Sequence, residues 1–322
     1  MNRPTVDDVR EAAVRLRGLA HRTALVPSFS ASTPSRDVRL KLESTQDTRS
    51  FKIRGAANAM IARADGAPGV VTYSTGNHGR ATAYVAARLG MSAVVCISTN
   101  TTGDKRHALT ALGADVRVVG ESQDAAAAEA RRLAEETDFT LIDPINDPLV
   151  TAGHATIGLE LLDQWPELDT VVVPVSGGAL ISGIALVMKE LRTGIRVVGV
   201  SMEGGAAMVE SQRAGRPVVV DEVASLADSL QGGITMDNTH TFAMVRDLVD
   251  ELVTVSEEEI AVAMVTALAR ERLVLEGAAA TPLAVAASDR AEMGERTVLV
   301  ATGAMVDVAT LTGLVAPRVE GN

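Results

Sequence analysis

The chain has 322 residues, of which 47% are hydrophobic and 22% charged, a composition typical of folded globular proteins. The formal net charge of −11, without a basic cluster, argues against nucleic-acid binding and against an anionic membrane surface. The single cysteine, Cys96, excludes an intrachain disulfide, and residues 1–22 contain no apolar segment of signal-peptide length, so we expect a cytoplasmic protein.

Strands and helices alternate through the first half of the chain. An amphipathic pattern predicts a helix over 6–19, a strand follows at 38–42, and a helix is expected from Gly55 to Ala64. From residue 69 onward, short connections join three strand–helix units, which is the signature of a parallel sheet covered by helices. These units have strands at 70–74, 92–97 and 116–119, and helices at 80–89, 104–112 and 123–136.

A turn-rich segment, 143–148, separates this part from a second α/β half. The second half is predicted to have strands at 170–175, 197–201 and 297–301, and helices at 152–162, 180–191, 239–249, 256–270 and 278–287. Residues 203–238 have a less regular pattern. We therefore predict two domains, one formed by 1–68 together with 147–322 and a smaller one formed by 69–146.

Lys52 lies at a strand-to-helix corner, in the segment Thr48-Arg49-Ser50-Phe51-Lys52, and Ser50 beside it is a candidate helix cap. A lysine amine becomes reactive when burial lowers its pKa or when it condenses with a carbonyl. The alternative is a surface lysine near a helix start. Three further strands end in glycine and small hydroxyl residues, at 74–79, 176–179 and 302–304, where parallel sheets bind ligands.

The sequence contains no dinucleotide-binding fingerprint and no Walker-type phosphate loop. The segment 176–180 is the best phosphate candidate, because two glycines precede a helix whose first N–H groups are free. A nucleotide-binding oxidoreductase and a catalytically silent binding protein remain alternatives at this point. No histidine or cysteine spacing indicates zinc, and we expect no metal.

These segments together resemble the fold-type II pyridoxal-phosphate enzymes, which share the tryptophan synthase β-like fold. Segment 41–56 resembles their cofactor-lysine segment, 74–79 their asparagine loop and 174–180 their glycine-rich phosphate loop. The threonine dehydratase and serine racemase group is the most similar branch. The resemblance implies an α/β fold with two open, twisted, mostly parallel sheets flanked by helices, bound pyridoxal 5'-phosphate and a homodimer.

The resemblance also implies roles for individual residues. Lys52 would be the Schiff-base lysine and the base for the α-proton, with Thr75 as a second catalytic residue. The implied cofactor-binding residues are Phe51, Lys52, Asn77 (at the ring oxygen), Ser176, Gly177, Gly178, Ala179, Leu180 and Thr302 (at the pyridine nitrogen). The implied substrate-binding residues are Ser74, Thr75, Asn77 and His78.

The implied reaction is loss of a β-hydroxyl group as water from a β-hydroxy amino acid, because a hydroxyl partner at the ring nitrogen suits elimination better than transamination. The product would be a 2-oxo acid and ammonia, as in threonine and serine ammonia-lyases. Alternatives are a dehydratase of hydroxyectoine breakdown or of 3-hydroxyaspartate, and a serine racemase that uses the Thr75 hydroxyl. Arg49 stands where the family usually has glycine, and it is a candidate for binding a second substrate carboxylate.

Overall fold

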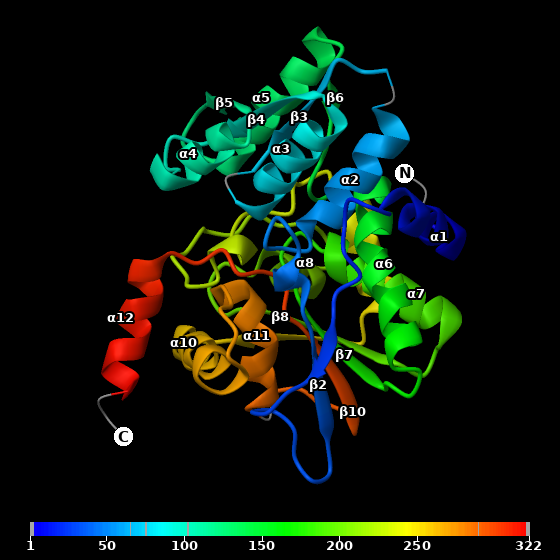
Figure 1. Ribbon diagram of the computed structural model, residues 1–322, viewed down its shortest axis with the longest axis vertical. Helices are drawn as coiled ribbons and strands as arrows, with labels where there is room; N and C mark the ends of the chain where they lie inside the picture. The colour runs from blue at the N-terminus through cyan, green and yellow to red at the C-terminus, as the bar shows by residue number, and fades with distance from the viewer. Residues whose placement is uncertain (1–2, 65, 75, 102, 289, 320–322) are drawn as a thin grey trace.

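The computed structural model describes residues 3–64, 66–74, 76–101, 103–288 and 290–319. Two sheets organise this part of the chain, the smaller above the larger in Figure 1. Both have helices on their two faces, as predicted. Before residue 140, the elements are α1 (Val6–Arg15), β1 (Leu25–Pro27), β2 (Asp37–Lys41), α2 (Lys52–Arg63), β3 (Gly69–Tyr73), α3 (Asn77–Leu89), β4 (Ser92–Ile97), α4 (Gly103–Ala111), β5 (Asp115–Val118) and α5 (Gln123–Glu136).

The remaining elements complete both sheets. They are β6 (Thr140–Leu141), α6 (Pro148–Gln164), β7 (Thr170–Pro174), α7 (Ala179–Leu191), β8 (Arg196–Met202), α8 (Ala207–Ala214), α9 (His240–Leu248), β9 (Glu251–Val255), α10 (Glu257–Thr266), α11 (Gly277–Ala286), β10 (Arg296–Val300) and α12 (Val308–Val319). Short helical turns, η1 (Glu43–Thr45), η2 (Asp228–Leu230) and η3 (Ala267–Glu271), link some of them.

The larger sheet has the strand order β1-β2-β10-β7-β8-β9, and only β1 runs antiparallel to its neighbour. Alternate side chains of its strands pack on opposite faces, as the period of two in a strand requires. Val171 and Val173 face the helices α6 and α7, whereas Val172 faces α10 and α11. Both faces are therefore buried, which explains why β7 is a continuous apolar run.

The smaller sheet has the order β5-β4-β3-β6, and all its strands are parallel. Val70 and Val95 pack against α2 and α3, whereas Val71 and Cys96 pack against α5. Cys96 is buried in β4. Helix α2 follows β2 of the larger sheet but contacts α3 beside the smaller one, so it connects the two sheets (Figure 1).

The observed elements differ from the predicted ones at several places, among them the start of α2 and the elements β9 and α12. Helix α2 begins at Lys52, not at Gly55, and Ser50 does not cap it, because its N-cap is Phe51 without a side-chain hydrogen bond. Strand β9 was not predicted, and it extends the larger sheet beside β8. Helix α12 was not predicted either, and it contains Pro317.

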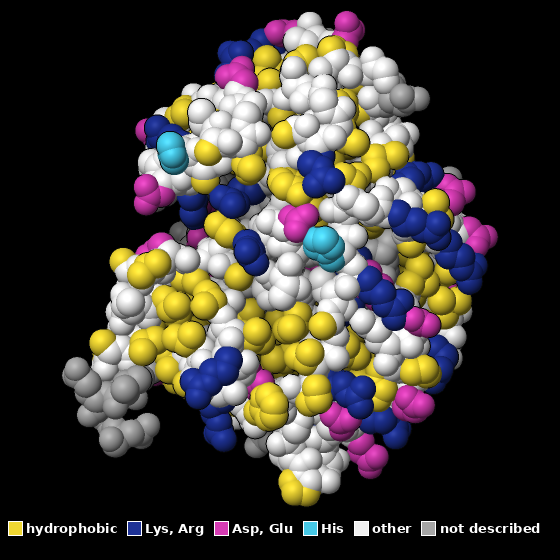
Figure 2. Space-filling view, viewed as in Figure 1, with side chains coloured by type: hydrophobic (Ala, Val, Ile, Leu, Met, Phe, Trp, Pro, Cys, Tyr) yellow, Lys and Arg dark blue, Asp and Glu magenta, His cyan; other side chains and the backbone are white. Residues whose placement is uncertain are grey.

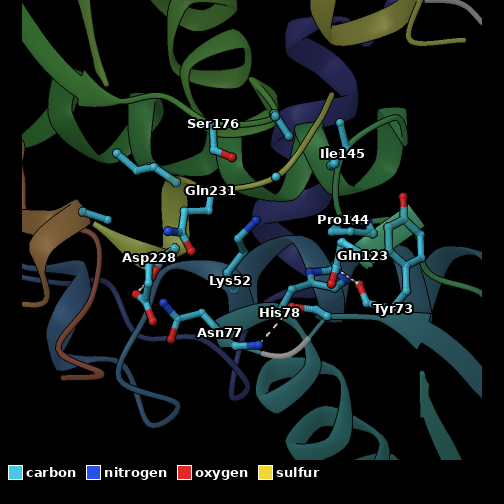
Figure 3. Close-up of a pocket in the computed structure, with 18 of the residues that line it drawn as sticks. Lys52, Tyr73, Asn77, His78, Gln123, Pro144, Ile145, Ser176, Asp228 and Gln231 are labelled. Carbon is cyan, nitrogen blue, oxygen red and sulfur yellow. Dashed lines mark hydrogen bonds between the residues drawn. The ribbon is translucent and has the colours of Figure 1, made fainter. Parts of the chain in front are cut away.

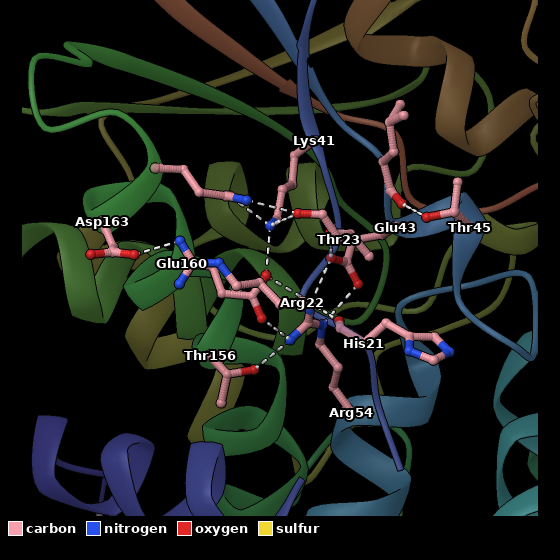
Figure 4. Close-up of polar contacts among 12 residues, drawn as sticks. His21, Arg22, Thr23, Lys41, Glu43, Thr45, Arg54, Thr156, Glu160 and Asp163 are labelled. Atoms are coloured by element: carbon pink, nitrogen blue, oxygen red, sulfur yellow. Dashed lines mark hydrogen bonds and ion pairs between the residues drawn. The ribbon is translucent and has the colours of Figure 1, made fainter. Parts of the chain in front are cut away.

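A buried ion-pair network fixes α2 to the larger sheet (Figure 4). Arg54 bonds Glu43 through Nε at 2.8 Å and Glu160 through Nη1 at 2.7 Å. Lys41 Nζ bonds Glu160 at 2.6 Å. The Arg54 guanidinium holds the pKa of Glu43 below its ordinary value although burial alone would raise it. The network joins β2, α6 and the first turn of α2, the turn that also contains Lys52.

Candidate active site

A cavity of about 350 Å³ lies where the strands of both sheets end (Figure 3). Residues after the carboxyl ends of β3, β7 and β10 line it, as expected for ligand sites in parallel sheets. The residues that line the cavity are far apart in the sequence, from Phe51 to Thr302. The cavity therefore collects the segments that the sequence singled out.

Lys52 projects into this cavity from the first turn of α2 (Figure 3). Its Nζ forms no hydrogen bond or ion pair with a described residue, and it lies 5.1 Å from the centre of the Phe51 ring. Burial lowers the pKa of Lys52 to about 8, although Glu276 and Asp143 favour the charged form. About a tenth of the amine is thus uncharged at pH 7, far more than for an ordinary lysine, and the uncharged form is the one that acts as a nucleophile or base.

The predicted phosphate loop, 176–180, lines the cavity and leads into α7. Gly178 has φ of 91°, a left-handed conformation that glycine adopts without steric cost. The first N–H groups of α7 lack partners within the helix and form its positive end, which favours a bound anion. The loop members at the cavity wall are Ser176, Gly177, Gly178, Ala179 and Leu180.

The asparagine loop approaches from the smaller sheet. Ser74, Asn77 and His78 line the cavity, and α3 begins at Asn77. Burial, together with the Lys52 charge, lowers the pKa of His78 to about 3, so the imidazole is neutral at physiological pH. Thr75, predicted to be catalytic and to bind substrate, lies outside the described residues.

Phe51 and Thr302 complete the predicted set, and the backbone carbonyl of Thr302 accepts from Phe51 N at 3.0 Å. Phe51 also meets His154 edge to face, with ring centres 4.7 Å apart. Arg49 is not among the described residues that line the cavity, and its side chain is exposed. Its φ of 61° is a left-handed conformation, which suits the glycine that the family usually has there.

The sequence reasoning missed Glu276, which precedes α11 and lies at the cavity wall. Asn77 Nδ2 donates to both of its carboxylate oxygens, at 2.8 and 3.1 Å. Burial raises the pKa of Glu276 to about 7, although the hydrogen bonds from Asn77 by themselves lower it. No local motif marks a lone glutamate 199 residues from its partner, so only the fold reveals it.

A second unpredicted residue at the cavity wall is Tyr73, which is hydrogen-bonded to Asp143. The Tyr73 hydroxyl donates to Asp143 Oδ1 at 3.0 Å, and the same oxygen accepts from Ile145 N at 2.8 Å. At the cavity wall near α4, Lys105 Nζ pairs with Asp228 Oδ2 at 2.8 Å. No cluster of three or more histidine, cysteine, aspartate or glutamate side chains suited to a metal ion occurs within the described ranges.

These features fit a lysine-bound cofactor with an anionic end. The Lys52 amine is unpaired by any described group, the start of α7 offers an anion site, and Asn77 Oδ1 is buried without a partner in the described part of the chain. Buried polar atoms in proteins are normally hydrogen-bonded. Asn77 Oδ1 has no surface open to the cavity, so the unpaired Lys52 amine and the start of α7 are the features that indicate a bound group there.

Comparison with known proteins identifies the group that binds in the cavity as pyridoxal phosphate. The model of the family described as "Pyridoxal-phosphate dependent enzyme" matches residues 16–303. A protein of Sinorhizobium fredii (strain NBRC 101917 / NGR234), named provisionally as a threonine dehydratase, is 42% identical over 308 residues, which cover 94% of this chain and 93% of that protein. L-threonine ammonia-lyase of Geobacter sulfurreducens is 38% identical, over 95% of this chain and 77% of the relative.

Solved structures agree with this assignment. Maize serine racemase superposes with a TM-score of 0.90 at 32% identity, covering 99% of both chains. The processed form of threonine deaminase isoform 2 from Solanum lycopersicum superposes with a TM-score of 0.87 at 30% identity, covering 98% of this chain and 91% of that one. The chain belongs to the pyridoxal-phosphate dependent enzymes, and its fold is the fold-type II architecture predicted from the sequence. Its cofactor is pyridoxal 5'-phosphate and its class is the ammonia-lyase type of lyase, as predicted.

Proposed function

We propose that this enzyme dehydrates a β-hydroxy amino acid, with L-threonine or L-serine as substrate, to a 2-oxo acid and ammonia. The observation that carries the proposal is the buried Lys52 amine, with its lowered pKa, in a cavity that Ser74, residues 76–78 and the loop at 176–180 line. The named activities of the threonine ammonia-lyase and threonine deaminase relatives support the same reaction.

The cofactor, when bound, withdraws electrons from the substrate α-carbon and thereby makes its proton acidic. Lys52 is our proposed cofactor anchor and the base that takes this proton, because its amine lies in the cavity and burial lowers its pKa to about 8. The N-terminal end of α7 would bind the phosphate. Phe51 and Thr302 would flank the ring, with Thr302 at the pyridine nitrogen.

The substrate carboxylate would bind at the start of α3. Ser74, Asn77 and His78 line the cavity there, and the free N–H groups of the first helical turn favour a negative charge. A neutral His78 can donate one hydrogen bond without adding charge. Thr75 lies in the same loop, and its catalytic role remains our prediction.

The cavity charges argue against a dicarboxylic substrate. The cationic side chains among its described lining residues are Lys52 and Lys105, and Lys105 is already paired with Asp228. Glu121 and Glu222 also line the cavity. A second carboxylate would therefore meet no free cation, which disfavours 3-hydroxyaspartate relative to threonine, serine or an acylated hydroxy-diamino acid.

A direct assay tests this proposal. The purified protein with pyridoxal phosphate should release 2-oxo acid and ammonia from L-threonine or L-serine, and should act at least about tenfold less efficiently on 3-hydroxyaspartate. D-serine and acylated hydroxy-diamino acids complete the panel. Absence of 2-oxo acid, ammonia or substrate loss with every compound would refute dehydratase function.

Serine racemisation is a second candidate, favoured by the similarity to maize serine racemase. Chiral analysis of residual L-serine decides it. The appearance of D-serine with the wild type but not with Thr75→Ala supports racemisation through Thr75, whereas elimination without D-serine excludes it.

We also propose a cytoplasmic homodimer. No helix among the described residues is long and apolar enough to cross a membrane. Exposed large apolar side chains support self-association, and Figure 2 shows hydrophobic side chains gathered over the lower half of one face. Light scattering should give the mass of two chains, and a mass of one chain would overturn the proposed dimer.

A further inference from the structure

Phe29 is an aromatic residue that projects from the protein surface. It is 77% exposed, whereas the other aromatic residues of the chain, all of which the structure describes, are buried or half-buried. It lies in the short segment between β1 and β2. A single exposed apolar residue is common on protein surfaces, so the surroundings of Phe29 decide what it does.

A half-buried carboxylate fixes the backbone on both sides of Phe29. Glu271, in η3, accepts hydrogen bonds from Phe29 N at 3.1 Å and from Ser30 N at 2.8 Å. The hydroxyl groups of Ser28 and Ser30 donate to the same carboxylate. The segment therefore presents the Phe29 ring from an ordered backbone, and a partner that binds the ring does not have to order the loop first.

An apolar groove of about 220 Å³ opens beside this segment, between α10 and α11. Ser30 and Ala31, which follow Phe29 in the chain, line the groove together with small or apolar side chains of the two helices, among them Val262, Ala263, Leu283, Ala284 and Ala287. Figure 2 shows hydrophobic side chains over this part of the surface. Phe29 itself is not among the lining residues, because its ring extends into solvent.

A second copy of the chain offers both parts of a matching contact. In a two-fold contact the same patch of each copy meets the other, so each ring can enter the groove of the opposite copy. An aromatic ring in an apolar pocket is the usual anchor of a protein interface. The ring and the groove lie side by side on one face, as such a contact requires.

The charges around the ring and the groove are complementary. Arg270 and Arg272 flank Glu271 in the chain, and both are exposed and form no ion pair with a described residue. Glu258 and Glu259 line the groove. In a two-fold contact, the residues around the ring of one copy face those around the groove of the other, so arginines meet glutamates.

We propose that this face, formed by Phe29 and the groove between α10 and α11, is the contact between two copies of the chain, and that each Phe29 ring fills the groove of the opposite copy. The inference rests on the homodimer proposed above and names the surface that forms it. The groove and the active-site cavity share no lining residue, so substitutions at this face leave the catalytic groups in place.

The first test is sedimentation equilibrium of the wild type and of Phe29→Asp over a series of concentrations. The wild type should have the mass of two chains. Phe29→Asp should raise the Kd of the dimer by at least about 100-fold, because both anchors are lost and a charge replaces each ring. Val219→Asp is the control and should keep the wild-type Kd. Val219 is 82% exposed, and its neighbour Val220 packs on the opposite face of the larger sheet.

A second variant tests the groove. Val262 is 45% exposed and lines the groove from α10, so Val262→Arg should fill it and dissociate the dimer as Phe29→Asp does. An equal mixture of the two variants should associate again. In the mixed dimer, the ring of the Val262→Arg chain enters the unaltered groove of the Phe29→Asp chain. The remaining contact places the introduced aspartate opposite the introduced arginine.

The outcomes separate this inference from the homodimer on which it rests. A wild type with the mass of one chain overturns both. A dimeric wild type with a Phe29→Asp variant of equal Kd, or with a mixture of the variants that stays monomeric, overturns the assigned face alone. Should Val262→Arg fail to fold by circular dichroism, Phe29→Asp decides the question, because the side chain that it replaces lies in solvent.

Discussion

We expect Lys52 to be reactive because of where its amine lies rather than because of its residue type. Its Nζ lies in the cavity over the Phe51 ring, and burial there outweighs the two carboxylates that favour the ammonium. The family resemblance identifies Lys52 from the sequence, whereas the burial that lowers its pKa comes from the fold. A lysine on the protein surface would remain almost fully charged at neutral pH.

We expect the rate of cofactor capture by the apoprotein to report this pKa. Only the uncharged amine attacks the cofactor aldehyde, so the rate should rise by about tenfold per unit below pH 8 and level off above it. The measurement is growth of the visible band at fixed excess pyridoxal phosphate. A rate that keeps rising to pH 10 would show an ordinary lysine, and Lys105→Ala should keep the wild-type profile.

Individual residues show both the reach and the limit of sequence reasoning. Lys52, Asn77 and the loop at 176–180 were expected at the site because each belongs to a contiguous motif, and the structure brings them to one cavity. Glu276 was not expected, because its partner is 199 residues away. Ser50 was expected to cap α2, but the helix begins without a side-chain cap.

At the scale of the elements, the start of α7 is our proposed anion site. The left-handed Gly178 lets the chain turn from β7 into the helix, and a Cβ atom there would lie 2.8 Å from Met208 Cε. The conformation and the contact both disfavour any larger residue. The phosphate site thus depends on backbone geometry.

Gly178→Ala should weaken pyridoxal-phosphate binding by about tenfold, which corresponds to the 1–2 kcal/mol of a left-handed alanine. Gly215→Ala is the control, because Gly215 has φ of 70° at the end of α8 with no atom near its Cβ position. Equal cofactor affinities of the two variants in apoprotein titrations would argue against the assigned phosphate loop.

The ion-pair network of Figure 4 anchors α2, the helix that carries Lys52. Arg54→Met should leave Glu43 without its main partner, and breaking a buried pair costs about 3–5 kcal/mol. Arg10→Met, which removes an exposed pair on α1, should cost less than about 1 kcal/mol. Urea unfolding measures both, and equal losses would contradict a structural role for the network.

There are physical reasons why β9 and α12 were not predicted from the sequence. Strand β9 is a five-residue segment between two helices, too short for its alternation to stand out, and pairing with β8 stabilises it. Helix α12 contains Gly313 and Pro317, two residues that normally predict a break. Strands in the middle of the sheets were predicted well because both their faces are buried and their apolar runs are continuous.

At the scale of the whole molecule, the site exists only because the two sheets meet. Lys52 and the phosphate loop follow strands of the larger sheet, whereas Asn77 follows a strand of the smaller one. Asn77–Glu276 and Lys105–Asp228 are direct contacts between these two parts. The βα units predicted two domains and the family resemblance implied two sheets, but the placement of one sheet against the other depends on packing between helices such as α2 and α3. The division into domains at 1–68 with 147–322, and 69–146, remains a prediction.

The central claim is that Lys52 both binds the cofactor and takes the substrate proton. Borohydride reduction of the protein loaded with pyridoxal phosphate, followed by peptide mapping and turnover assays, tests it most directly. We expect a visible band that reduction bleaches, the cofactor fixed to Lys52, and a folded Lys52→Ala variant without 2-oxo acid production. A cofactor fixed to another lysine, or elimination retained by Lys52→Ala, would contradict the account.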